Sequence, residues 1–388
     1  MAVTKFVKLK DCATIIAGQS PQSKYYNTTG EGLPFFQGKA DFGELHPTVR
    51  VYCSKPTKIA EKDDILLSVR APVGPTNLSP GKVCIGRGLT AIRPDDSLDL
   101  KYLLNYFRYF EIQLASQGTG TTFKAITQAV VKNLEIPIPP KDEQRRIVSR
   151  IEELFSKLDK GVETLQTTKQ QLAVYRQAVL KETFSNVLGK KTLIKDVCNA
   201  IKVGIVIKPT QYYVQTGGVF AFRNSNVRRG CIEDKDWVMI SKSGHHANSR
   251  SEVHAGDVLI SRSGVNLGMA AVVPERFDGY NAIDVIIAVP EQTKLLPEYL
   301  VHYTNSPYGQ EIVKERERGA AQAHLNVKVY GNLSISIPTM EVQKEVVTKI
   351  EKQLSLCDNI EQTVDEALAQ ADAMRQSILR QAFEGGII

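Results

Sequence analysis

One short phrase of alternating apolar residues occurs twice in the chain, as NLEIPIPPKDEQRRIV (133–148) and as NLSISIPTMEVQKEVV (332–347). In the first copy Leu134, Ile136 and Ile138 recur at every second position, which predicts a short strand. Two prolines then end the strand, because proline has no amide hydrogen to donate to a neighbouring strand. The second copy follows at an offset of 199 positions. We therefore expect a duplicated strand that leads into a further element.

A long amphipathic helix is predicted after each copy. Asp142 and Glu143 would lie in the first turn, where acidic side chains favour the positive end of the helix dipole, and Gly189 lies beyond the last periodic residues. At ~1.5 Å per residue, a helix of about 45 residues would be roughly 65 Å long. Apolar residues at steps of three, four or seven form the seam expected to pack: Ile147, Ile151, Leu154, Leu158, Leu165, Leu172 and Val179 in the first copy, and Val346, Ile350, Leu354, Cys357, Val364, Leu368, Ala371 and Ile378 in the second.

Each helix needs a surface that covers its single apolar seam. Pairing of the two helices with each other satisfies both seams and predicts an intramolecular antiparallel coiled coil. The alternative is that each helix packs on its own globular block as an ordinary amphipathic helix. A seam of this length exceeds what a small domain can cover, which favours pairing.

The duplication extends far beyond the short phrase. The same offset holds for more than forty residues without insertion or deletion, which indicates a duplicated rigid element. Polar positions match as well as apolar ones: Gln144 with Gln343, Glu152 with Glu351, Asp159 with Asp358, Arg176 with Arg375, and Gln177 with Gln376.

The segments upstream of the helices resemble each other more weakly, as in KDDILLSVRAPVG and AGDVLISRSGVNLG. They contain short β-branched runs broken by Gly, Pro, Asn and Asp, with a helix around Tyr102–Leu114. We therefore predict an α+β fold with a pseudo-two-fold repeat of two mixed, mostly β domains joined by the long helices. The predicted division is 1–140 (first domain), 141–188 (first helix), 189–338 (second domain) and 339–388 (second helix).

Composition is consistent with a multidomain globular chain. At 388 residues the chain is long enough for at least two cores, and 42% of its residues are hydrophobic. The six cysteines are scattered without a C-x-x-C pair, which argues against a disulfide framework and a zinc knuckle. No apolar run reaches the ~20 residues that a membrane span needs. We expect a cytoplasmic protein without a membrane segment.

The net charge of +7 is unevenly distributed. Residues 1–140 hold 17 Lys and Arg against 12 Asp and Glu, and residues 188–338 hold 18 against 14. The last segment, 339–388, is acidic, with five basic against nine acidic residues. Excess positive charge in the two domains favours a polyanionic partner such as DNA.

Catalytic motifs are weak. GLPFFQGKA differs from a phosphate-binding loop in its glycine spacing and in Ala40, where Ser or Thr would bind magnesium. The E-x-K pattern of EDK (233–235) has no upstream acidic partner, and His245, His246 and His254 fit a polar loop better than a metal site. No Asn/Asp-Pro-Pro-Tyr/Phe methylation motif occurs. We expect no cofactor, no metal and no catalysis by this chain.

The whole chain resembles the DNA-specificity subunit of type I restriction-modification systems. The resemblance rests on the order of variable block, NLEIPIPP with a long helix, variable block, and NLSISIP with a long helix, and on DILLS and DVLISRSG inside the blocks. It implies that each block is a target recognition domain for one half of a split, asymmetric double-stranded DNA sequence. It also implies that the helices set the spacing and dock two methyltransferase subunits, and that motor-nuclease restriction subunits complete the complex.

Base recognition requires donor and acceptor groups on exposed loops. Candidate DNA contacts in the first block are Gln19, Lys24, Gln37, Lys39, Arg70, Thr119, Thr121 and Lys124. Candidate DNA contacts in the second block are Arg223, Asn224, Asn226, Arg228, Arg229, Arg262, Ser263, Asn266, Arg316, Arg318, Gln322 and His324. Arg70 and Arg262 follow a shared strand, so a scaffold role is the alternative for these two.

Two other classes of function remain as alternatives. A self-contained nuclease or methyltransferase of similar layout would need a catalytic constellation in one block. A structural protein with two lectin-like β domains would show no salt-sensitive binding to DNA.

Overall fold

The computed structural model describes residues 5–119, 124–311 and 324–385. The chain forms two compact units: unit 1 comprises Met1–Leu165 with Glu366–Ile388, and unit 2 comprises Gln166–Asp365. Mixed sheets and long helices confirm the predicted α+β class. The division into four consecutive segments stays a prediction, since packing groups the chain differently.

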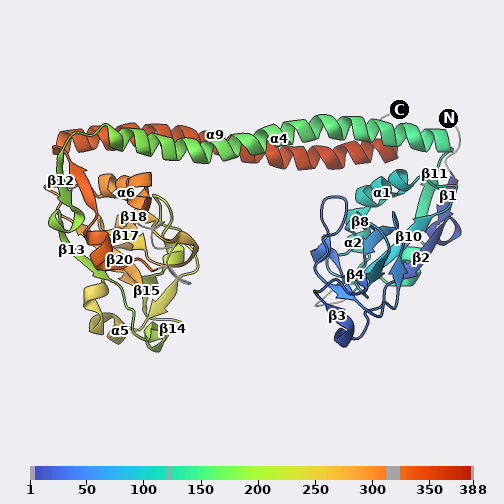
Figure 1. Ribbon diagram of the computed structural model, residues 1–388, viewed down its shortest axis with the longest axis horizontal. Coiled ribbons are helices and arrows are strands. Elements are labelled where there is room, and N and C mark those ends of the chain that lie inside the picture. The colour runs from blue at the N-terminus through green and yellow to red at the C-terminus, as the bar shows by residue number, and fades with distance from the viewer. Residues whose placement is uncertain (1–4, 120–123, 312–323, 386–388) are drawn as a thin grey trace. The chain divides into compact units, whose positions relative to one another are not determined.

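Helices α4 (Lys141–Ser185) and α9 (Met340–Glu384) are each 45 residues long, as predicted, and each contributes to both units. Asp142 and Glu143 lie in the first turn of α4, and the predicted strand before it is β11 (Glu135–Ile138). In each unit the parts of α4 and α9 lie side by side and run in opposite directions (Figure 1).

Unit 1 contains a two-stranded ribbon and two larger sheets. The ribbon pairs β1 (Lys5–Lys8) with β11. An antiparallel sheet has the order β2-β10-β7-β8, with β2 (Ala13–Ala17), β7 (Ile65–Ser68), β8 (Thr76–Leu78) and β10 (Leu89–Pro94). The other sheet has the order β3-β5-β4-β9-β6, with β3 (Tyr26–Asn27), β4 (Leu33–Phe36), β5 (Tyr52–Cys53), β6 (Ile59–Ala60) and β9 (Val83–Ile85).

The helices of unit 1 besides α4 and α9 are α1 (Leu100–Tyr109), α2 (Glu111–Ser116) and α3 (Gln128–Lys132). The helix expected around Tyr102–Leu114 is thus two helices, because Phe110 leaves the helical conformation at φ −85° and ψ 2°. Asp99 caps α1 by accepting hydrogen bonds from the amides of Lys101 and Tyr102.

Unit 2 repeats this arrangement. Its ribbon pairs β12 (Lys190–Leu193) with β21 (Ser334–Ile337). Its antiparallel sheet has the order β13-β20-β17-β18, with β13 (Cys198–Val203), β17 (Val258–Ser261), β18 (Ala270–Val272) and β20 (Val285–Pro290). Its second sheet has the order β14-β16-β15-β19, with β14 (Tyr213–Val214), β15 (Val219–Phe222), β16 (Val238–Ile240) and β19 (Asn281–Ala282).

The shorter helices of unit 2 include α5 (Lys242–Ala247), α6 (Pro297–Asn305) and α8 (Val327–Gly331). The ribbon and the antiparallel sheet have the same strand order in both units, which is the structural form of the sequence repeat. The second sheets differ, since unit 1 has the extra strand and α5 follows β16 in unit 2. The duplicated scaffold therefore carries two different outer parts.

A buried glutamine ties each long helix to its unit. Gln144 is completely buried; its Oε1 accepts a bond from the Asp99 amide (2.7 Å), and its Nε2 donates to the carbonyls of Ser97 and Pro139 (both 2.9 Å). Gln343 makes the same three bonds in unit 2, with the Leu296 amide and the carbonyls of Lys294 and Pro338. These three hydrogen bonds explain why glutamine occurs at this position in both copies of the repeat.

Each unit is closed by the end of a helix that begins in the other unit. In unit 1 the Phe383 ring, near the end of α9, packs at 5.3 Å from the rings of both Tyr102 and Tyr106. In unit 2 the Phe184 ring, near the end of α4, packs at 5.3 and 5.4 Å from Tyr299 and Tyr303. The four tyrosine hydroxyls donate to carbonyls of β11 or β21. Burial raises the pKa of Tyr106 to about 12, so these donors stay protonated.

Matching ion pairs join the helices within each unit. Arg375 pairs with Asp159 in unit 1, and Arg176 pairs with Asp358 (2.6 Å) and Glu361 (2.8 Å) in unit 2. Two of the polar matches of the repeat, Asp159 with Asp358 and Arg176 with Arg375, are thus the two ends of equivalent bridges. The fifteen seam residues predicted to pack are all buried or half-buried. Ile147 and Ile151 lie in the core of unit 1 with α1 and Leu379, so the helices pack both on each other and on the sheets.

We predict that Gln144→Ala lowers the free energy of unfolding by about 1–3 kcal/mol, because it leaves a buried amide and two carbonyls without their partner. Urea denaturation measures the change. Gln171→Ala is the matched control, since Gln171 is exposed on the same helix. Equal stability of the two variants would contradict the role of Gln144.

Candidate nucleic-acid interface

Four loops of unit 1 meet along one edge, which we call the unit 1 edge: residues 18–25, 36–39, 69–70 and 86–88. Backbone hydrogen bonds fix their order. The Gln19 amide donates to Ile85 (3.0 Å), the Gly86 amide to Phe36 (2.8 Å) and the Val69 amide to Gly88 (2.9 Å).

Segment 53–58 joins the same edge. The Thr57 hydroxyl donates to the Gln19 carbonyl, and the Ile85 amide donates to the Lys58 carbonyl. Residues 119 and 124–126 join its other end, where the Ile126 amide donates to Val69 and Ala125 forms bridges with Arg70 and Thr119. The edge therefore combines six stretches that are far apart in the sequence.

The unit 1 edge is strongly basic. Loops 18–25, 53–58 and 86–88 contain no Asp or Glu, and Asp41 next to the edge accepts a bond from the Gln37 amide (2.9 Å). The exposed cations are Lys24, Lys39, Lys55, Lys58, Arg70, Arg87 and Lys124. Lys39 lies in a pocket that Glu44 and Glu111 also line, but the three loops without acidic residues still give the edge an excess of positive charge. Such an excess attracts a polyanion.

Aromatic side chains lie among these cations. The Nζ atoms of Lys24 and Lys55 each lie 5.1 Å from the centre of the Tyr25 ring. Tyr26 stacks on Phe35 at 4.7 Å. Burial raises the pKa of Tyr26, while the positive charge of Arg87 acts in the opposite direction.

The candidate residues of the first block converge on this edge. Gln19, Lys24, Gln37, Lys39 and Arg70 are exposed there, as are Thr119 and Lys124 beside them. Thr121 lies outside the described residues. Their contact with DNA stays a prediction.

Sequence reasoning missed Tyr25, Lys55, Lys58 and Arg87. The available signal was the lack of acidic residues in their loops, but only the sheet shows that these loops are neighbours. β4 and β9 pair in parallel, which brings the loop after Phe36 next to Gly86 and Arg87.

The unit 2 edge consists of the equivalent loops 204–211, 223–229, 262–268 and 283–285, with residues 324–325. The Gly204 amide donates to Val285 (2.8 Å), the Ile283 amide to Phe222 (2.8 Å) and the Leu325 amide to Arg262 (3.0 Å). The loop order thus matches that of unit 1.

Asn224 is the centre of a hydrogen-bond network on the unit 2 edge. Its Oδ1 accepts bonds from the Ser261 hydroxyl (3.0 Å) and the Arg262 amide (2.8 Å). Its Nδ2 donates to the Ser263 hydroxyl (2.8 Å), and its carbonyl accepts a bond from Asn266 Nδ2 (2.9 Å). Asn224 therefore braces the 262–268 loop, with its amide group fully engaged.

Asn226 is buried inside unit 2, where its Oδ1 accepts a bond from the Arg223 amide and its Nδ2 donates to the carbonyls of Glu233 and Lys235. In this arrangement no polar atom of Asn226 is available to a base. Asn266 is buried as well. These residues were expected to contact DNA; the structure instead gives both an internal bracing role, because their amides satisfy backbone groups of the loop.

The arginines of the second block are also engaged within the unit. Arg262 Nη1 lies 3.1 Å from Asp284 Oδ1, and its Nε donates to the Leu325 carbonyl (3.2 Å). The Arg262 side chain is only 19% exposed, which supports its alternative scaffold role.

Three further arginines have internal partners. Arg228 pairs with Glu233, Arg223 Nη2 donates to the Asp236 carbonyl (2.6 Å), and Arg229 Nη1 donates to that of Asn305 (2.9 Å). Arg228 and Arg262 thus have carboxylate partners, whereas Arg223 and Arg229 donate to neutral carbonyls and keep their positive charge. Ser263 lies in the network, and His324 is exposed beside Leu325. Arg316, Arg318 and Gln322 lie outside the described residues.

Candidate metal ligands do not assemble among the described residues, where no group of three His, Cys, Asp or Glu side chains is placed to hold an ion. Asn281 Nδ2 lies 3.2 Å from His245 Nδ1, and His254 Nδ1 lies 3.3 Å from Asp278 Oδ1. Glu233 of the E-x-K pattern pairs with Arg228 and Lys235. Within the described ranges, no helix is both long and apolar enough for a transmembrane segment.

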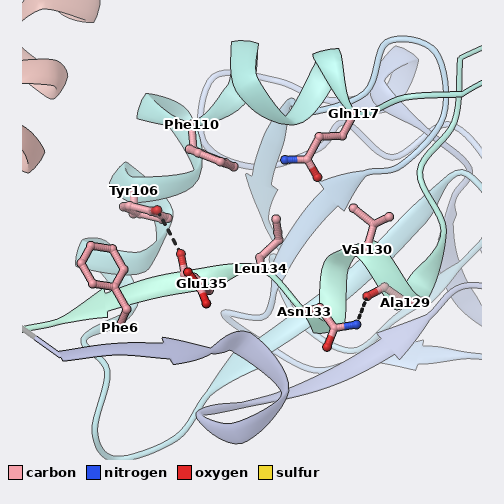
Figure 2. Close-up of a pocket in the computed structure, with 9 residues that line it drawn as sticks. All are labelled: Phe6, Tyr106, Phe110, Gln117, Ala129, Val130, Asn133, Leu134 and Glu135. Carbon is pink, nitrogen blue, oxygen red and sulfur yellow. Dashed lines mark hydrogen bonds between the residues drawn. The ribbon is translucent and has the colours of Figure 1, made fainter.

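A cavity of about 680 Å³ lies apart from the unit 1 edge, between α1, α3 and the β1–β11 ribbon (Figure 2). Its walls are mostly apolar side chains, and the one carboxylate, Glu135, has no acidic or basic partner among the lining residues: Phe6, Tyr106, Phe110, Gln117, Ala129, Val130, Asn133, Leu134 and Glu135. Tyr106 donates to the Glu135 carbonyl and Asn133 Nδ2 to that of Ala129. The cavity offers no acid–base pair.

Comparison with known proteins agrees with this geometry. Residues 3–172 match the family model of the type I restriction modification DNA specificity domain. The putative type I restriction enzyme MjaX specificity subunit of Methanocaldococcus jannaschii is 38% identical over 46% of this chain and 41% of its own length. The EcoBI specificity subunit of Escherichia coli is 27% identical over 75% of this chain and 66% of its own length.

A crystal structure of the HsdS subunit from Thermoanaerobacter tengcongensis is 49% identical over 40% of this chain and 38% of that chain, with a TM-score of 0.38. The chain thus spans about two fifths of the first curated relative and about two thirds of the second. By these family and sequence matches, the chain is similar to type I restriction-modification DNA specificity subunits.

Proposed function

We propose that this chain is the DNA-binding specificity subunit of a type I restriction-modification complex. Each unit reads one half of an asymmetric, bipartite sequence in double-stranded DNA. The chain itself performs no catalysis, and partner methyltransferase and restriction subunits carry out adenine methylation and cleavage at the selected site.

The observation that carries this proposal is the repeated scaffold with unlike edges. The buried glutamines, the tyrosines and the helix ion pairs recur in both units. The two edges present different side chains from equivalent loops. Two different half-sites require this combination. The shared scaffold fixes the position of the contact groups, and the different side chains on the two edges specify different bases.

The unit 1 edge supports DNA as the partner. Four of its cations, Lys24, Lys55, Lys58 and Arg87, lie on loops without acidic residues, and the Nζ atoms of two of these lysines lie near the Tyr25 ring. Lysine and arginine bind phosphates, while glutamine side chains such as Gln19 and Gln37 are suited to adenine. One edge therefore offers groups for both backbone and base contacts.

The helices support the docking of partner subunits. In unit 1 a groove of about 490 Å³ on the helix pair is lined by Leu154, Leu158, Met374 and Ile378 among others. In unit 2 the helix pair exposes Val174, Tyr175, Leu356 and Ile360. Tyr175 is the repeat equivalent of Met374, so each unit offers an apolar helical surface for one methyltransferase subunit.

The proposal also assigns the spacing of the half-sites to α4 and α9. A continuous helix resists compression, and half-sites read from one face of DNA lie about 34–36 Å apart or at multiples of that distance. The length of the helix pair would then set the unread gap.

A methylation assay with a labelled methyl donor tests the function. We expect no methyl transfer by the chain alone and transfer to one specific sequence once the methyltransferase subunit is added. The complex without this chain is the control and should give no sequence-specific transfer. Activity of the chain alone would support the alternative of a self-contained methyltransferase.

We predict that the double variant Lys55→Gln, Arg87→Gln weakens binding to all DNA sequences, because both cations lie on the acid-free unit 1 edge. Each lost phosphate contact lowers the slope of log affinity against log salt by about 0.9, so the pair should lower it by about 1.8. Fluorescence anisotropy of the assembled complex over a salt series measures the slope. Lys10→Gln is the control, since Lys10 is exposed beside the β1–β11 ribbon; the same loss in this control would contradict the assignment.

We predict that removing seven residues from each helix at equivalent positions, 162–168 and 361–367, shortens the gap between half-sites by about three base pairs. Seven residues of helix span about 10 Å, and one base pair spans about 3.4 Å. Methylome sequencing of cells with the variant and its partners reveals the gap. A variant of unchanged length, Gln166→Ala with Gln170→Ala, should keep the original gap; a shortened helix pair with an unchanged gap would refute the spacing role.

A further inference from the structure

We infer that Val265 contacts the methyl group of a thymine in the half-site that unit 2 reads. This inference rests on the proposed function and names one side chain that determines specificity within it. The evidence lies in the exposure of Val265, the bracing of its loop, the contrast with unit 1 and the charge of its surroundings.

Val265 is 97% exposed, more than Leu188 at 91%, the next most exposed large apolar side chain of the described residues. The side chain therefore gains nothing from the folding of unit 2. Fully burying a valine stabilises by about 1.5–3 kcal/mol, which becomes available only when another molecule covers it.

The loop that carries Val265 is held in a fixed conformation. The Gly268 amide donates to Ser261 (2.8 Å) and the Leu267 amide to Gly264 (3.1 Å). Gly264 and Gly268 have φ angles of +73° and +77°, which favour glycine. Asn266, next to Val265, is buried and bonded to Asn224. The tip therefore cannot fold back onto the sheet, and Val265 is presented outward.

The equivalent loop of unit 1 presents a different side chain at its tip. Ser68 and Ser261 begin the two loops, and the hydroxyl of each donates to the carbonyl two residues further on, that of Arg70 or Ser263. Counted from these serines, Val265 corresponds to Pro72, which is also exposed, and the buried Val73 corresponds to the buried Asn266. The same place on the scaffold therefore presents proline in unit 1 and valine in unit 2.

The charge around Val265 favours a base over a phosphate. Arg262 is paired with Asp284, and Ser263 lies 3.4 Å from the same carboxylate. This region has no unopposed cation among those side chains. In the major groove only thymine presents a methyl group, and small apolar side chains recognise it by contact. A short, branched valine at the tip of a braced loop fits that role.

The test uses the full chain assembled with its methyltransferase subunits, once methylome sequencing has given the target. Each thymine of the unit 2 half-site is replaced in turn by deoxyuridine, which lacks only the methyl group. We expect one replacement to weaken binding about fourfold, since ~0.8 kcal/mol accompanies burial of one methyl group. Val265→Ala should weaken binding to the thymine target and lose sensitivity to that replacement.

Leu188→Ala is the matched control, because it also removes an exposed apolar side chain from unit 2, and it should keep the sensitivity. The inference is overturned if the half-site contains no thymine, if no replacement matters, or if Val265→Ala stays sensitive. If only the inference about Val265 is wrong, the unmodified complex still binds DNA with sequence specificity. Loss of any sequence preference in that complex would instead remove the proposed function.

Discussion

The exchange of helix ends between the two repeats is the constraint on which the rest of the structure depends. Phe383 completes the aromatic core of unit 1, and Phe184 completes that of unit 2, each from a helix that starts in the other unit. Neither repeat therefore has a finished core from its own consecutive residues. This arrangement explains why the offset of 199 holds without insertions: a shift of one residue would turn the phenylalanine away from its tyrosines by about 100°.

The same constraint separates the residues that hold the scaffold together from the residues of the edge loops. Gln144 and Gln343 are buried where the long helices meet the sheets, and the ion pairs of Arg375 and Arg176 lie between the helices. None of these groups belongs to the edge loops. Changes in the loops can therefore alter the contact surface while the frame keeps its geometry, which suits two domains that share a fold and differ in target.

The sequence predicted the frame well because repetition and periodicity report local geometry. Leu134, Ile136 and Ile138 indicated the strand before α4, and the seam indicated both helices. The edges were less predictable, because a polar side chain in a loop has the same sequence pattern whether its partner is water, protein or DNA. The side chains of Asn226 and Arg262 bind other groups of the protein. Arg87, in contrast, reaches the edge only because β4 and β9 pair in parallel.

The two edges use different physical means on one scaffold. The unit 1 edge has many exposed cations, and the attraction of such charges to phosphates is long-ranged and weakened by salt. On the unit 2 edge Arg228 and Arg262 are paired with carboxylates and Asn224 holds the loop, so the groups of this loop are preorganised. On the proposed function, the unit 1 edge adds a long-ranged attraction to DNA, while each unit still reads its own half-site through short-ranged contacts.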